Sequence, residues 1–105
     1  MTPAELFEQM QGKIADRPEL ADEVGAVFQF DVSGDDGGSW VVDLREAPGQ
    51  VRTGAADDVD CVISVSAKDL VGIMSGQVDP QMAFMMGRIK VAGNFMLATK
   101  LRALM

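Results

Sequence analysis

Residues 65–101, VSAKDLVGIMSGQVDPQMAFMMGRIKVAGNFMLATKL, decide the fold, because helix start and stop signals alternate there with a strand pattern. The first helix of this stretch begins after Ser66, which forms a capping box with Asp69. Gly76 follows the apolar residues of that helix and ends it. We expect the helix to cover the apolar face of a sheet built from the preceding residues.

A second helix follows directly in the same stretch. Asp79 is a good helix cap, and Pro80 suits the first helical position because its missing N–H would have no partner there. Residues 81–86 are apolar nearly all round, and Gly87 ends the helix. A helix without a polar face is buried, so we expect this one to be covered on more than one side.

The last part of the stretch predicts a strand and a terminal helix. Residues 88–91 alternate in polarity, which places Arg88 and Lys90 on one face of the strand. Gly93 and Asn94 then turn the chain and cap the helix. The apolar stripe of that helix is Leu97, Leu101 and Leu104.

Two helices are predicted at the beginning of the chain. Thr2 caps the first of them, and Pro3 occupies its first helical position. We expect Asp16 to cap a second, short helix that ends at Gly25.

Between these helices and the decisive stretch, the apolar residues recur at every second position, which is the period of a half-buried strand. Residues 27–32, 40–45 and 60–66 are predicted strands, with a shorter strand around Val51. The glycine-rich residues 34–38 predict a tight reversal between the first two strands. Three hairpin-linked strands, each with one apolar face, predict an antiparallel sheet that needs a helical cover.

Composition narrows the classes of protein that this chain represents. With 105 residues it is expected to be a single domain, residues 1–105. It has no histidine, so the commonest general base and metal ligand is missing, and we expect neither an enzyme nor a cofactor or metal site. Cys61 is its single cysteine, and is expected to be a small buried hydrophobe. No signal peptide is recognised, so a cytoplasmic location is expected.

The motifs together resemble those of the sterol-carrier protein 2 (SCP-2) family. The resemblance is carried by a Gly-x-x-Asp-Pro turn at residues 76–80, an Ala-Phe-Met helix at 83–85, and a Gly-x-Ile-Lys-Val-x-Gly strand at 87–93. Upstream, it extends to a Trp-led strand at Trp40 and an Asp-x-x-Ile-Ser strand at 60–64. Arg88 stands where the family often has Lys. The last residues, Ala103-Leu104-Met105, do not form a peroxisomal signal, so the resemblance is expected to be to a stand-alone, bacterial-type member.

This resemblance implies an α+β fold with a five-stranded, mostly antiparallel sheet covered on one face by helices. It also implies a non-catalytic lipid carrier that holds a sterol, fatty acid, acyl-CoA or phospholipid in an apolar cavity between sheet and helices. Methionine suits such a cavity because its flexible, polarizable side chain adapts to changing contents. The predicted lining residues are Ile73, Met74, Met82, Phe84, Met85, Met86, Phe95, Met96, Leu101 and Leu104.

Charge is distributed unevenly along the chain. The net charge of the chain is −7, so we do not expect it to bind nucleic acid. Residues 80–105, however, contain no acidic residue and carry four basic residues. Those bases are Arg88, Lys90, Lys100 and Arg102. They are expected either to offset a neighbouring acidic face or to ring the cavity mouth, where they would contact an anionic lipid group or a membrane surface.

The sequence is also compatible with a second function besides lipid carriage. The chain is alternatively a ligand-free interaction or oligomerisation domain that has the same fold. A continuous apolar cavity favours the carrier, whereas a closed core with an exposed apolar patch favours the interaction domain.

Overall fold

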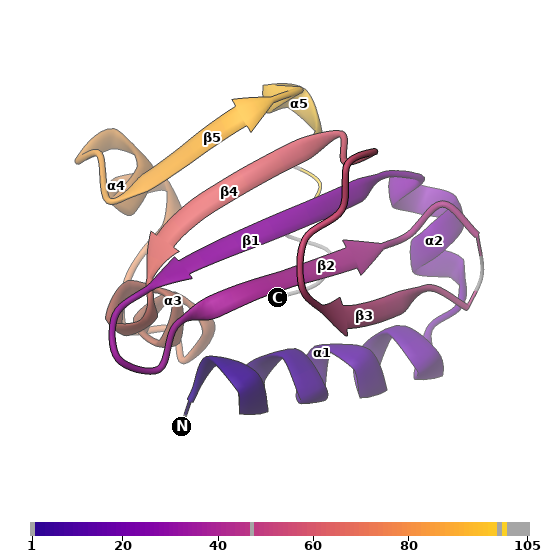
Figure 1. Ribbon diagram of the computed structural model, residues 1–105, viewed down its shortest axis with the longest axis horizontal. Helices are drawn as coiled ribbons and strands as arrows, with labels where there is room; N and C mark the ends of the chain where they lie inside the picture. Colours follow the sequence, from indigo (N-terminus) through magenta and orange to yellow (C-terminus); the bar gives the residue numbers. More distant parts are fainter. Residues whose placement is uncertain (1, 47, 99, 101–105) are drawn as a thin grey trace.

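The structure is a computed structural model that describes residues 2–46, 48–98 and 100 (Figure 1). Five strands form one sheet in the order β3-β2-β1-β4-β5. Helices pack against one face of this sheet, so the fold is α+β as expected. The elements are α1 (Pro3–Asp16), α2 (Glu19–Val24), β1 (Val27–Ser33), β2 (Gly38–Asp43), β3 (Gln50–Thr53), β4 (Cys61–Ser66), α3 (Ala67–Met74), α4 (Pro80–Met85), β5 (Ile89–Gly93) and α5 (Phe95–Ala98).

The sheet is mixed, with three antiparallel pairings and one parallel pairing. β1 with β2, β2 with β3, and β4 with β5 run antiparallel. β1 and β4 run parallel, with Phe28 opposite Cys61 and Phe30 opposite Ile63. The expectation of a five-stranded, mostly antiparallel sheet is confirmed, and the parallel pair in its centre is a feature that the hairpin signals did not indicate.

The core lies between the helices and the face of the sheet that carries the alternating apolar residues. Phe28 and Cys61 are almost completely buried on this face. From α1, the ring of Phe7 stacks on Trp40 at 4.7 Å between centroids and meets Phe30 edge-on at 5.3 Å. Such aromatic pairs add to the free energy gained from burying their area. The apolar faces predicted for β1, β2 and β4 therefore all point into one core.

Most of the predicted helix caps are confirmed. The side chains of Thr2, Ser66 and Asp79 accept hydrogen bonds from backbone N–H groups in the first turns of α1, α3 and α4. Asp16 is different, because α1 continues as far as this residue and no side chain caps α2. The Asp16 cap is therefore wrong: Ile14 is still part of the buried stripe of α1, and burial extends that helix.

The connection from β3 to β4 crosses the outer face of the sheet, away from the helices. The strand order requires this connection to pass β2 and β1, because β4 lies on the far side of both from β3, and Figure 1 shows it crossing in front of them. The backbone N–H of Ala56 donates to Gln29 Oε1 at 3.2 Å, and Asp60 Oδ2 accepts from the N–H of Val27 at 2.9 Å. Val41 is fully buried although it faces away from the core. It lies opposite Gln29 in the strand register, and Gln29 is the residue that holds Ala56 of this crossing segment, residues 54–60.

Arg45 ties the crossing segment to the sheet. Its guanidinium lies 2.8 Å from Asp43 of β2 and 2.8 Å from Asp58 of the segment. These hydrogen bonds lower the pKa of both carboxyl groups below their usual range. The crossing segment therefore covers one end of the outer face of the sheet. The other end of this face, near the β1–β2 hairpin, is open.

Candidate functional site

The predicted lining residues divide between the core and the surface. Ile73 is buried on α3, and Met74 at the end of α3 is half-buried against the core. The exposed large apolar side chains in the described part of the chain are Met82, Phe84, Met85, Met86 and Met96. Leu101 and Leu104 lie outside the described residues, and so does the side chain of Phe95.

The expectation that α4 is buried on more than one side is wrong. Of its six residues only Ala83 is buried, whereas Met85 is 74% exposed and Phe84 is 40% exposed. The reason lies in where this short helix packs: the backbone N–H of Arg88 donates to the Ala83 carbonyl at 2.9 Å, which holds the helix beside the edge strand β5. A helix at the edge of a sheet has less surface to pack against than one that lies across its face.

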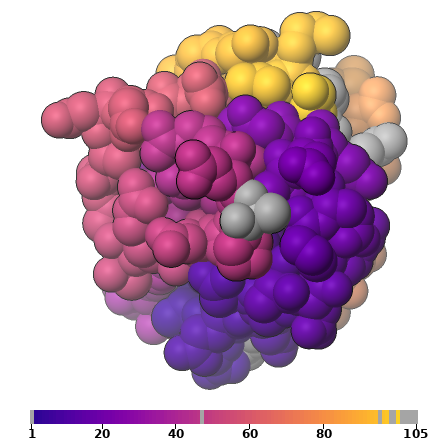
Figure 2. Space-filling view, turned by 90° about the vertical axis from the view of Figure 1, so that its right-hand side faces the viewer, coloured from indigo at the N-terminus to yellow at the C-terminus, as the bar shows by residue number. Residues whose placement is uncertain are grey.

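Four of the exposed side chains form what we call the α4 cluster, namely Met82, Phe84, Met85 and Met86. Met96 belongs to α5, and Figure 1 shows α4 and α5 at opposite ends of β5. Figure 2 presents the end of the molecule at α2, with the yellow residues of β5 and α5 at its upper rim. The α4 cluster is thus contiguous along the chain, and Met96 lies apart from it at the other end of β5.

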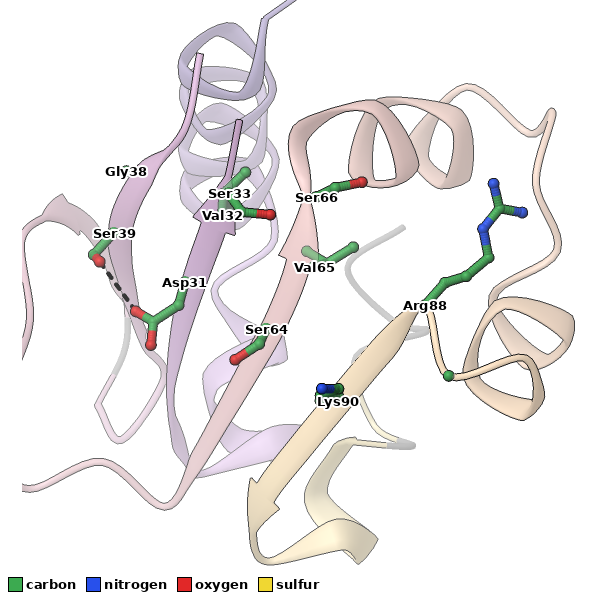
Figure 3. A pocket seen from close by; sticks show the side chains of 11 residues that line it. Asp31, Val32, Ser33, Gly38, Ser39, Ser64, Val65, Ser66, Arg88 and Lys90 are labelled. Carbon is green, nitrogen blue, oxygen red and sulfur yellow. Dashed lines mark hydrogen bonds between the residues drawn. The ribbon is translucent and has the colours of Figure 1, made fainter. Parts of the chain in front are cut away.

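A groove of about 580 Å³ opens on the outer face of the sheet, at the end that the crossing segment leaves uncovered. The register of the strands places Ser39, Asp31, Ser64 and Lys90 in one row across β2, β1, β4 and β5. Figure 3 shows these residues around the groove. The lining residues are Asp31, Val32, Ser33, Gly38, Ser39, Ser64, Val65, Ser66, Gly87, Arg88 and Lys90.

Charged groups of both signs lie along this groove. Asp31 Oδ1 accepts hydrogen bonds from Gln29 Nε2 at 2.9 Å and from Ser39 Oγ at 3.0 Å, which fixes the carboxylate. Arg88 pairs with Asp69 of α3 at 3.0 Å, so this base does offset a neighbouring acid. Lys90 forms no ion pair with any residue that the structure describes.

Sequence reasoning did not find this groove. In the sequence, Ser64 and Ser66 alternate with the apolar residues of their strand, and Asp31 alternates with Phe30 and Val32 in the same way. A row of polar residues becomes visible only when the register between strands is known, because its members are far apart in the sequence. Asp31, Ser64 and Lys90 meet because β4 pairs with β1 on one side and with β5 on the other.

The described residues offer little for acid–base or metal chemistry. No group of three or more Asp, Glu or Cys side chains among them is arranged to hold a metal ion. Cys61 is buried, as expected, and its burial together with the Asp60 carboxylate raises the pKa of the thiol. A thiol with a raised pKa is a poor nucleophile near neutral pH. None of the helices described is long and apolar enough to cross a bilayer.

Comparison with known proteins identifies the family. The profile of the SCP-2 sterol transfer family matches residues 5–105. The chain belongs to this family. Sterol carrier protein 2 of Rattus norvegicus is 35% identical to this SCP-2 chain in an alignment of 103 positions that covers 94% of this chain and 19% of that protein. The solution structure of the sterol carrier protein domain 2 of Helicoverpa armigera has a TM-score of 0.79 at 30% identity, covering 95% of this chain and 82% of that one.

Some members of the SCP-2 family with similar sequences are much longer proteins. Hydroxysteroid dehydrogenase-like protein 2 of Bos taurus is 40% identical in an alignment of 102 positions that covers 96% of this chain but only 24% of that protein. This SCP-2 chain thus spans about a quarter or less of the length of the bovine and rat relatives.

Proposed function

We propose that this SCP-2 chain is a non-catalytic lipid-binding domain that takes up a sterol, fatty acid, acyl-CoA or phospholipid. The observation that carries the proposal is the match of residues 5–105 to the SCP-2 sterol transfer family. The α4 cluster, in which four large apolar side chains are exposed within five consecutive residues, supplies an apolar surface for the ligand. Each methylene that moves from water into apolar contact contributes about 0.8 kcal/mol. An alkyl chain placed against this cluster would therefore gain free energy and would also cover the exposed side chains.

The proposed lipid site extends from the α4 cluster toward the core between sheet and helices. Ile73 and Met74 of α3 form its inner wall in this proposal, because both pack at the margin of the core. The remaining lining residues are proposed at the α5 end of the chain, namely Phe95, Met96, Leu101 and Leu104. Methionine supplies much of this lining, and its flexible side chain accommodates ligands of different shape.

The exposed cluster also supports a second candidate function, an interaction domain that uses the same surface for another protein. An exposed apolar patch is the feature that favours this candidate, because large patches of this kind mark binding sites for proteins as well as for ligands. The relatives favour this candidate in one respect, because in them the matching region is a minor part of a longer chain.

Native mass spectrometry of the protein as purified separates the two candidates. We expect a bound species of several hundred daltons, because an exposed apolar site retains lipid from the cell, and organic extraction should release it as an identifiable lipid. The bare mass of the chain, both as purified and after incubation with a mixed lipid extract, would contradict lipid carriage. An added mass of protein size would instead support the interaction domain.

We propose in addition that this SCP-2 chain makes transient contact with anionic membranes through Arg88, Lys90, Lys100 and Arg102. Lys100 is exposed, and Arg102 lies outside the described residues. Each Lys or Arg near an anionic surface contributes about 1 kcal/mol, and salt screens this within about 10 Å. The proposal is supported by the absence of acids from residues 80–105 of the sequence.

Reversal of two of these charges tests the membrane contact. Lys100→Glu with Arg102→Glu should slow lipid transfer to anionic vesicles more than to neutral vesicles, and raised salt should remove the difference. The matched control is the same reversal at Arg17 and Lys68, which should affect both vesicle types equally. Equal slowing on both types by the Lys100 and Arg102 pair would show that these bases do not contact the membrane.

A further inference from the structure

A row of polar residues on the outer face of the sheet has the form of a binding site that is separate from the proposed lipid site. This polar row consists of Ser39, Asp31, Ser64 and Lys90. It lies on the opposite face of the sheet from the helices, where Asp31 and Lys90 line a concave groove. The volume of this groove, about 580 Å³, falls within the range of small-molecule sites. Figure 3 shows Asp31 and Lys90 on either side of Ser64.

The two charged ends of the row, Asp31 and Lys90, form no ion pair with each other in the structure. Neighbouring strands lie about 4.8 Å apart, so Asp31 on β1 and Lys90 on β5 are about 10 Å apart at the backbone, with β4 between them. A charged hydrogen bond spans about 2.8 Å at each end. A molecule that bridges the two residues therefore presents a cationic group to Asp31 and an anionic group to Lys90.

The side chains at each end define the groups that such a molecule would carry. At one end, Asp31 is fixed through Oδ1 by Gln29 and Ser39, and its Oδ2 makes no hydrogen bond within the described part of the chain, so it can accept from an ammonium group. At the other end, Lys90 is a cation, with the Ser64 hydroxyl beside it as a further donor. A phosphate suits this end because its several oxygens can accept from both donors at once.

We propose that this groove binds a short zwitterion with an ammonium group and a phosphate ester, the chemistry of phosphoethanolamine. The ammonium group contacts Asp31, and the phosphate contacts Lys90 and Ser64. A free phosphodiester and a lipid headgroup both present this chemistry. The site is independent of apolar binding, since the contacts involve no acyl chain.

Amide NMR with soluble glycerophosphoethanolamine tests the site. We expect saturable shifts at the amides of Asp31, Ser64 and Lys90. Glycerophosphoglycerol, which has the phosphodiester but no ammonium group, should bind about tenfold more weakly because it loses the charged hydrogen bond to Asp31. Asp31→Asn should remove this preference, whereas Asp22→Asn, an equal charge change on the exposed surface of α2, should keep it.

Lys90→Met should lower the affinity for both probes about tenfold, while Lys68→Met on α3 should leave the affinity for both unchanged. Bicelles with and without phosphoethanolamine lipid distinguish the two sources. Shifts with the soluble probe would show that a free phosphodiester suffices, and the same shifts with phosphoethanolamine bicelles alone would identify the lipid headgroup. No saturable shift with either probe, or an unchanged preference in Asp31→Asn, would overturn the proposal.

Discussion

Phe84→Asp is expected to abolish uptake of a fluorescent fatty acid while the chain stays folded. Phe84 is 40% exposed on α4, so a carboxylate at this position remains in contact with water in the free protein. A bound acyl chain would cover that carboxylate without giving it a partner, and burying an unpaired charge costs several kcal/mol. The exposure of α4 thus allows a test that would unfold the chain if this helix were buried.

The measurement is a fluorescence titration accompanied by thermal unfolding of each variant. Met85→Gln should weaken binding without abolishing it, because an amide costs less to cover than a charge. Gln81→Asp places the same new charge on a polar position of the same helix and should leave affinity unchanged. Wild-type affinity in Phe84→Asp, with folding intact, would remove α4 from the lipid site.

Phe28→Ala is expected to lower the free energy of unfolding by about 3–5 kcal/mol, the usual cost of removing a buried phenylalanine ring. Phe28 is completely buried on β1, where it pairs with Val42 of β2 and Cys61 of β4. Small domains have a free energy of unfolding of only about 5–15 kcal/mol, so this single substitution would remove a large part of it. Urea unfolding followed by tryptophan fluorescence of Trp40 measures the loss.

Phe84→Ala is the matched control, since it removes the same ring from a largely exposed helix. We expect it to lower the free energy of unfolding by no more than about 1 kcal/mol. Similar losses in the two variants would mean that the α4 cluster is as well packed as the core, which is incompatible with a surface that binds lipid.

The caps and strand faces were predictable from the sequence because their signals are local. Ser66 and Asp69 are three residues apart, and so a helix start can be recognised within one turn. The alternation of Cys61, Ile63 and Val65 likewise identifies the buried face of β4 within one strand. These features gave the fold class and, through the order of the motifs, the family.

The parallel pairing and the exposure of α4 were not predictable in the same way. No turn joins β1 to β4, so their pairing depends on the path of residues 54–60 across the sheet. The composition of α4 shows that its side chains are apolar but not what lies against them. Among the predicted lining residues, Ile73 lies at the core and Met85 at the surface, and no periodicity within the helices separates these two environments.

The position of β1 has a consequence for the growing polypeptide during synthesis. Phe28 of β1 pairs with Cys61, which is 33 positions further along the chain. Until β4 has been made, one edge of the future central strand has no partner, although its side chains are among the most apolar in the protein. Unpaired apolar edges associate with other chains. Nascent chains that stop before β4 should therefore need chaperones, and pairing over this long separation should make folding slower than in a sheet built from hairpins alone.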